Sequence, residues 1–309
     1  MWLGYILAAL GSFLFATKGI FIKLAYQYHI DASELLSLRL FFSTPFFVIF
    51  GLLTTYRQKK RHPEISHSLD PVLCLKAMAV GILGYWVSSY ADFAGLETLS
   101  PQFERLIIFL YPLFVLILGA LFFKNKLKAY GLWFFTISYF GLAIVFLHDL
   151  KAYGPSIIVG TLWCSTCSVT FALYLLLAKP LIGRLGPSLF TSFAMTGAAI
   201  ATFIHFFIAH RLSDIHMSPP LLSLCIGLAI GATVLPSYLT NFALSKISSQ
   251  ANAIISFINP IITLILSGLF LHSNLTLADY LGTLLVVLGV GLYSYFDQKS
   301  APLKKPSIG

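Results

Sequence analysis

The sequence predicts an all-α integral membrane protein with ten transmembrane helices, built as two inverted five-helix repeats. Composition is the first observation behind this prediction, because 58% of the 309 residues are hydrophobic and only 10% are charged. Soluble domains are about 45–50% apolar and about 25% charged, so this chain needs lipid as its solvent. The other two observations are recurring apolar segments of spanning length and an internal repeat.

Apolar segments of about 20 residues recur along the chain, separated by short polar breaks or breaks with Gly and Pro. Several segments begin with Pro, which lacks an N–H that the first helical turn would leave unpaired anyway. Unpaired backbone groups are costly in lipid, so each segment is expected to be a helix. The expected spans are Leu3–Tyr26, Ser33–Thr54, Pro71–Leu96, Pro101–Phe123, Lys128–Leu147, Pro155–Ala178, Pro187–Ala209, Pro219–Leu244, Gln250–Leu271 and Thr276–Phe296.

The basic residues predict the orientation of these spans. The even-numbered loops and the C-terminus hold 13 Lys or Arg residues, whereas the odd-numbered loops hold only Lys151 and Arg211. Cytoplasmic loops carry an excess of Lys and Arg, so both termini are expected in the cytoplasm of a multi-pass protein of the cell inner membrane. The same distribution explains the net charge of +9 without nucleic acid as a partner.

The fourth and fifth spans are repeated as the ninth and tenth. Residues 100–122 align with residues 248–270, and both copies share a Ser-x-Gln start and a Pro ten residues later. Five is an odd number, so the second repeat must enter the membrane from the opposite side. Inverted repeats are typical of secondary transporters, whose substrate site lies at the repeat interface near the bilayer midplane.

Several motifs resemble the EamA-type branch of the drug/metabolite transporter (DMT) superfamily, over nearly the whole chain. They are Phe15-Ala-Thr-Lys-Gly-Ile-Phe-Ile-Lys23, Arg39 early in the second span, Ala94-Gly-Leu-Glu-Thr-Leu-Ser100, and Tyr111-Pro112 with its repeat Asn259-Pro260. The family usually has a Glu just after the fourth and ninth spans. This chain has Lys124-Asn125-Lys126 and Ser273-Asn274 there, so any role of that Glu is absent or altered.

The resemblance implies a first EamA-like repeat over residues 1–149, a second over 150–297, and a cytoplasmic tail over 298–309. It also implies a central cavity between the halves, lined by spans one, three, four, six, eight and nine, and alternating access that exports amino acids or other metabolites.

Four ionisable residues are placed within the outer half of the membrane: Lys18, Arg39, Glu104 and Arg105. Ionisable side chains inside a membrane are costly and usually face a cavity or a partner. They are therefore candidates for substrate binding, and the alternative is structural, with Glu104 neutralising Lys18 or Arg39. A further hypothesis is that Glu104 couples transport to protons.

Uncharged residues complete the predicted site. In the repeat alignment Glu104 corresponds to Asn252 and Tyr111 to Asn259, so each half would carry a polar stripe at positions i and i+7 of equivalent helices. Trp86, Tyr90 and Trp163 lie in expected cavity helices and could stack on a substrate, or could only pack or anchor the chain. Asn241 in the eighth span is a further polar candidate.

The predicted function is therefore secondary transport, as export of a small polar or amphipathic metabolite such as an amino acid. Uptake or exchange of an anionic or nucleotide-derived metabolite, held by Lys18, Arg39 and Arg105, is the alternative. A membrane enzyme or a scaffold is less consistent with the sequence, which has no phosphate loop and no H-E-x-x-H pattern. No catalytic residue, cofactor or metal is predicted, and the expected partners are the lipid bilayer and a small-molecule substrate, in a monomer or homodimer.

Overall fold

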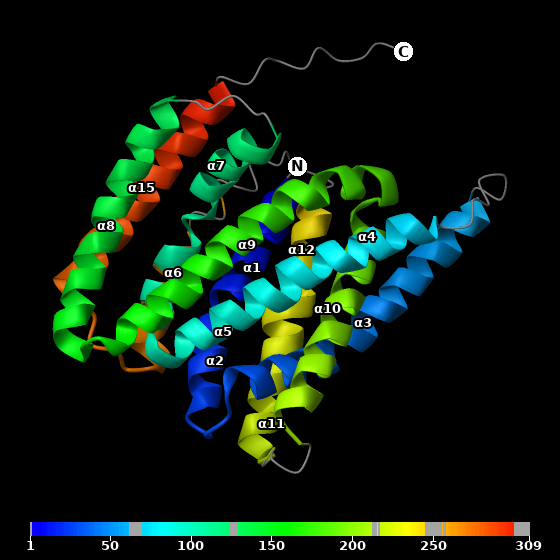
Figure 1. Cartoon of the computed structure of the whole chain (residues 1–309), viewed down its shortest axis with the longest axis horizontal. Coiled ribbons are helices and arrows are strands. Elements are labelled where there is room, and N and C mark those ends of the chain that lie inside the picture. The colour runs from blue at the N-terminus through cyan, green and yellow to red at the C-terminus, as the bar shows by residue number, and fades with distance from the viewer. Residues whose placement is uncertain are drawn as a thin grey trace.

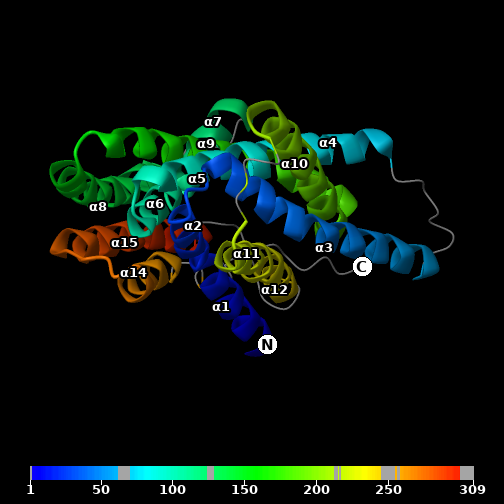
Figure 2. The same ribbon diagram turned by 90° about the horizontal axis from the view of Figure 1, so that it is seen from below.

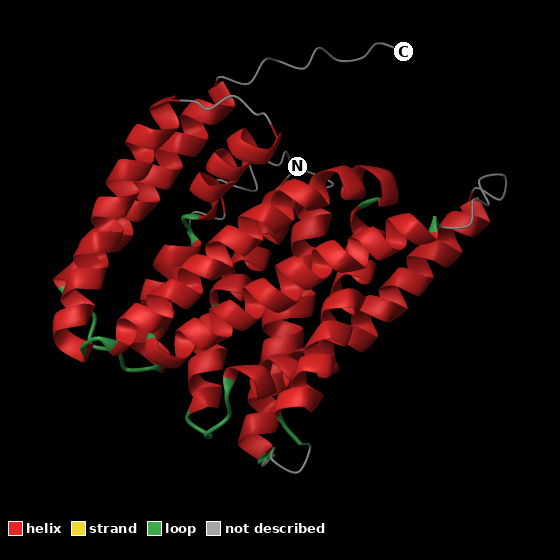
Figure 3. Ribbon diagram, in the orientation of Figure 1, coloured by secondary structure: helices red, strands yellow, loops and turns green. Residues whose placement is uncertain are grey.

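The computed structural model consists of helices and their connections, with no strand among the residues it describes (Figure 3). Those residues are 2–61, 70–123, 129–211, 215, 217–244, 255 and 258–299. Within them, the predicted all-helical membrane fold is confirmed.

The helices of the first half follow the expected spans closely. They are α1 (Trp2–Ala16), α2 (Lys18–Tyr26), α3 (Ala32–Arg61), α4 (Pro71–Gly81), the π-helix η2 (Ile82–Val87), α5 (Ser88–Thr98), α6 (Pro101–Ile108), α7 (Tyr111–Phe123) and α8 (Ala129–Tyr153).

The second half has a similar order of long and interrupted helices. They are α9 (Ser156–Leu185), α10 (Pro187–Ala209), α11 (Pro219–Ile226), the π-helix η4 (Gly227–Val234), α12 (Leu235–Leu244), α14 (Asn259–Phe270) and α15 (Leu277–Lys299).

Among the described residues, eight continuous helical segments are long and apolar enough to cross a membrane. The apolar helices at residues 259–270 and 277–293, where the ninth and tenth spans are expected, are shorter. Most of the residues ahead of α14 lie outside the described part of the chain. The chain is therefore a multi-pass membrane protein, and the count of ten spans stays a prediction.

Two kinds of interruption divide the spanning helices. Pro112 and Pro260 are the second residues of α7 and α14, and each follows a non-helical turn. Proline cannot donate a backbone hydrogen bond, which explains a break just before it. The π-helices η2 and η4 interrupt the third and eighth spans, and each widens the turn by one residue.

A hydroxyl group accompanies each π-helix. Ser88 Oγ donates to the Leu83 carbonyl at 3.2 Å, and Thr233 Oγ1 donates to the Leu228 carbonyl at 2.9 Å. Both bonds reach back five residues, which is the spacing of a π-turn. The two halves thus distort equivalent helices in the same way.

Packing between the halves follows a regular pattern (Figure 1). The third span packs on α9 and α10, which open the second half, and the eighth span packs on α1 and α3, which open the first. α6 contacts α14, and α8 contacts α15. In Figure 2, α4 and α9 run along one side of the molecule and α1 and α12 along the other.

The connections at residues 27–31, 99–100, 154–155 and 271–276 gather at one end of the bundle (Figure 1). The start of α1, the α9–α10 turn at Gly186 and the end of α15 lie at the opposite end. Following the predicted orientation, we call the first the outer end and the second the inner end.

Candidate substrate site

A buried ion pair joins the first and third spans. The helix is interrupted at Thr17, and Lys18 begins α2 with its ammonium group directed at the Asp92 carboxylate of α5, to which it donates a hydrogen bond. The Asp92 side chain is 1% exposed and the Lys18 side chain 18%. Two opposite charges in this setting neutralise each other where neither could be solvated alone.

Glu104 and Arg105 of α6 lie next to this pair. The Glu104 carboxyl is fully buried, lies beside the Asp92 carboxyl, and has Arg105 Nε 3.8 Å from its Oε2 atom. Neither Glu104 oxygen has a hydrogen-bond partner among the described residues. We call Lys18, Asp92, Glu104 and Arg105 the buried tetrad.

The ion-pair partner of Lys18 is Asp92, which differs from the structural alternative in which Glu104 neutralises Lys18 or Arg39. Arg39 lies in a different setting. Its Nη2 atom donates to Ser89 Oγ at 3.2 Å, and its guanidinium carbon lies 5.1 Å from the centre of the Phe93 ring. Its Nε atom is buried without a partner among the described residues, so Arg39 retains unused donor capacity.

Three of the predicted aromatic residues gather around His205 of α10. The rings of Trp86 and Tyr90 meet the imidazole edge to face at 5.8 and 5.0 Å, and Trp163 packs in the same way on Tyr90 at 5.8 Å. Ser33 Oγ lies 3.5 Å from His205 Nδ1. Spans two, three, six and seven therefore contribute to one aromatic cluster, from which Trp163 is 37% exposed.

The predicted polar stripes are only partly described. Glu104 belongs to α6 and Tyr111 begins α7, so a non-helical turn separates the two residues. Tyr111 packs edge to face on Phe171 of α9 at 5.3 Å, and Asn259 Oδ1 is buried without a partner among the described residues. Asn252 and the side chain of Asn241 lie outside the described part of the chain.

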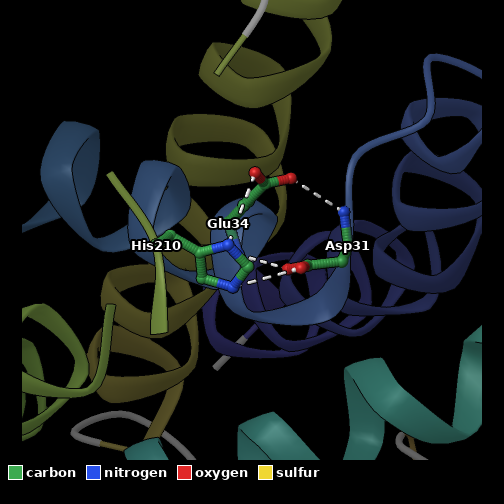
Figure 4. Close-up of side chains that lie close together, drawn as sticks. All are labelled: Asp31, Glu34 and His210. Carbon is green, nitrogen blue, oxygen red and sulfur yellow. Dashed lines mark hydrogen bonds and ion pairs between the residues drawn. The ribbon is translucent and has the colours of Figure 1, made fainter. Parts of the chain in front are cut away.

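A second polar cluster joins the outer ends of α3 and α10 (Figure 4). Asp31 and Glu34 form a capping box, with Glu34 N donating to Asp31 Oδ1 at 2.8 Å and Asp31 N donating to Glu34 Oε2 at 3.1 Å. The other oxygen of each carboxylate faces the His210 ring, at 3.2 Å for Asp31 and 3.8 Å for Glu34. The capping box explains why both carboxylates lie at the start of α3, and His210 holds the end of α10 against them.

Sequence reasoning missed two central members of the site, Asp92 and His205. Both were visible as ionisable residues within expected spans, which is the signal that could have identified them. Their partners, however, lie 74 and 172 residues away in the sequence, at Lys18 and Ser33.

A comparison with known protein families identifies the family to which this chain belongs. The sequence model of the EamA-like transporter family matches residues 2–147 and again residues 158–295. The chain belongs to the EamA-like transporter family. Its two family matches fall on the two halves of the chain, on either side of the connection between α8 and α9.

Relatives of this EamA protein are also transporters. It is 27% identical over 286 residues to the uncharacterised transporter YcbK of Bacillus subtilis, an alignment that covers 90% of this chain and 88% of YcbK. An uncharacterised transporter of Archaeoglobus fulgidus is 26% identical over 219 residues, covering 70% of this chain and 75% of that protein. A solved crystal structure covers 96% of this chain and 98% of its own, with 15% identity and a TM-score of 0.62, which shows a shared fold.

Family membership and the apolar helices together make the chain a membrane transporter of the DMT type. They point away from an enzyme. The lipid bilayer and a small-molecule substrate are its partners.

Proposed function

We propose that this EamA protein is a secondary transporter that exports a small polar or amphipathic metabolite, such as an amino acid, by alternating access. The observation that carries the proposal is the buried tetrad. Four ionised groups within spanning helices are costly, and such groups are usually retained where a substrate or a proton passes.

The charges of the tetrad favour a substrate without large net charge. Lys18 is matched by Asp92, and Arg105 lies beside Glu104, so the tetrad has no net charge when all four groups are ionised and a single positive charge when Asp92 and Glu104 share a proton. An anionic substrate would have to compete with Asp92 for Lys18. This leaves Arg39 as the main cation for the alternative function, the uptake or exchange of an anionic metabolite.

The packing between the halves supports alternating access by two inverted repeats, which we assign to residues 1–149 and 150–297. Each interrupted span packs on the first two spans of the other half. A rearrangement of one half therefore changes its contacts with the other, as rocking of two repeats around a central site requires. With the inner end in the cytoplasm, both termini are cytoplasmic and the protein lies in the inner membrane.

Proton coupling follows from the two adjacent carboxyls. Two ionised carboxylates side by side repel each other, and neither can donate a hydrogen bond. A proton shared by Asp92 and Glu104 would provide the donor that the Glu104 oxygens lack. We propose this pair as the site at which a proton binds during the transport cycle.

Metabolite profiling of cells with and without the gene tests the function. We expect one amino acid or similar metabolite to accumulate inside cells that lack the gene, and proteoliposomes that contain the purified protein to transport it. Depletion of a metabolite from those cells, with uptake restored by the gene, would instead support the uptake function.

Glu104→Gln tests the coupling. Because Gln keeps the size of Glu but cannot exchange a proton, we expect transport that no longer responds to a pH gradient, while exchange of substrate across the membrane persists. Net transport that keeps its full pH dependence in this variant would rule out Glu104 as the coupling group.

A further inference from the structure

Two adjoining hollows lie at the outer end of the bundle, between the outer ends of α2, α8 and α14. The larger has a volume of about 280 Å³ and the smaller about 90 Å³. Ser100, Asp149, Tyr153 and Ser273 line both, so the two are continuous. We call them together the outer trough.

The outer trough is lined by one basic and two acidic side chains. Among the described residues, Lys23 is the sole Lys or Arg that lines the trough, and it lines only the larger hollow. Asp279 lines only the smaller hollow, and Asp149 lines both. Asp149 therefore shares the larger hollow with Lys23, and Asp279 lies in the smaller hollow beyond it.

Both carboxylates are held in place by their neighbours. Asp149 Oδ1 lies 3.2 Å from His148 Nδ1, and Asp279 Oδ2 accepts hydrogen bonds from the backbone N–H and the hydroxyl of Thr276, each at 2.8 Å. Both aspartates are only 5% exposed. Each has a second carboxylate oxygen for which these bonds do not account, and a positively charged ligand group would suit such oxygens.

The larger hollow is also partly apolar, because Leu99, Ile157 and Leu271 line it. Its volume is near the lower limit for small-molecule sites, so it suits a ligand of a few carbon atoms. The tetrad lies close by along the chain, since Lys23 follows Lys18 by five residues and Ser100 precedes Glu104 by four.

We propose that the outer trough is a second binding site, for a small zwitterion with an aliphatic side chain, whose carboxylate binds at Lys23 and whose ammonium binds at Asp149 and Asp279. The proposal rests on the proposed export function, in which the trough receives the substrate after it has passed the tetrad. It extends that function by naming the charge pattern of the substrate.

Protection of an engineered cysteine tests the site. Ser273→Cys in right-side-out vesicles is labelled with a membrane-impermeant methanethiosulfonate cation, and the unsubstituted protein gives the background from the native cysteines. The probes are L-leucine, isopentylamine and 4-methylpentanoate, which share an alkyl chain and carry both charged groups, the ammonium alone or the carboxylate alone. We expect leucine to slow labelling at a concentration about tenfold below that needed for either other probe.

Substitutions locate the two ends of the ligand. In the Ser273→Cys background, Lys23→Met and Asp149→Asn should each raise the leucine concentration for half-protection about tenfold, whereas Asp149→Glu should keep most of the protection. Asp70→Asn at the inner end is the matched control, because Asn caps α4 as well as Asp does and the change should leave protection unaltered. Melting temperatures without ligand establish that each variant is folded.

The outcomes separate this proposal from the proposed function. Absence of protection by leucine, equal protection by the three probes, or unchanged protection in both Lys23→Met and Asp149→Asn overturns the outer trough as a zwitterion site. Leucine transport with an unaltered KM in both variants also overturns it and leaves the export function in place. Charge-dependent protection without any amino-acid transport supports the trough and overturns amino acids as the exported substrate.

Discussion

The two halves of this EamA protein pack in the same pattern but bury different chemistry. The first half places Lys18, Asp92, Glu104 and Arg105 inside its spans. The eighth span and α14 of the second half contain no Asp, Glu, Lys or Arg, and in the repeat alignment the sequence has Asn252 at the position of Glu104. A repeated scaffold therefore does not require a repeated site.

Several hydroxyl groups of the second half are hydrogen-bonded within the protein. Thr233 donates to a carbonyl of its own span, Thr263 Oγ1 donates to the Ala16 carbonyl at 3.2 Å, and Ser267 Oγ donates to Gln102 Oε1 at 2.7 Å. A hydroxyl in lipid is satisfied by one nearby carbonyl, whereas an ion needs a counter-ion. The first half therefore carries the charged part of the candidate site, and the second half contributes uncharged polar groups and His205.

The largest expected effect comes from Asp92→Asn, which removes the hydrogen-bonded counter-ion of Lys18. We expect a loss of stability of about 3–5 kcal/mol, because a buried charge loses its ion-pair partner, and transport reduced at least about 100-fold. Thermal unfolding of the purified protein and transport in proteoliposomes measure the two effects.

The double variant Lys18→Met/Asp92→Leu separates structure from function. Replacing both charges with apolar groups should restore most of the stability but not the transport. A stable and active double variant would mean that the pair only holds the helices together.

The next effect concerns the contact between the halves at the crossing of α4 and α10. A Cβ at Gly197 would lie 2.6 Å from the Met78 carbonyl oxygen, so Gly197→Ala should destabilise the protein by about 1–3 kcal/mol. A Cβ at Gly231 of η4 would have no neighbour within 4 Å. Gly231→Ala is therefore the control, and equal melting temperatures for the two variants would contradict the close crossing.

A smaller effect is expected at the aromatic cluster, where the second half contributes His205. His205→Ala removes the ring contacts with Trp86 and Tyr90 and should raise the KM for the exported substrate about 3- to 10-fold. His205→Phe should return the KM most of the way to its original value, because Phe keeps an aromatic ring at this position. Ile208→Ala, at a side chain 81% exposed on the same helix, should leave KM unchanged.

The smallest effects compare the two π-helices. Ser88 Oγ lies 2.7 Å from Thr170 Oγ1 of α9 in addition to its bond within the helix, whereas the described contact of Thr233 is within its own span. Ser88→Ala should therefore lower the free energy of unfolding by about 1–2 kcal/mol, and Thr233→Val by about 1 kcal/mol. A larger loss for Thr233→Val would show that the second π-helix is the more important one.

The helical architecture could be predicted from the sequence because lipid imposes a simple rule. Apolar segments in lipid must be helical, and Pro112 and Pro260 predict the breaks that precede α7 and α14. The orientation follows the basic loops in the same way and stays a prediction. These features depend on local composition, which a single sequence contains.

The partners within the site could not be predicted, because they depend on the rotation of each helix about its axis. Lys18, Glu104 and Arg105 were expected near one another from their depth, and the structure brings them together. Depth alone could not distinguish Glu104 from Asp92 as the counter-ion of Lys18. Depth alone also could not show that Arg39 lies apart from the buried tetrad and faces Ser89 and Phe93.

The π-helix η2 lies between the inner part of the third span and Asp92. In a regular α-helix each residue advances the chain by about 100° around the axis, and a π-turn accommodates one residue more than an α-turn. The part of the third span on the outer side of η2 is therefore rotated about the helix axis by about 100°, relative to an unbroken α-helix. The carboxylate that meets Lys18 therefore belongs to the part of the third span that lies beyond this distortion, which begins ten residues earlier, at Ile82.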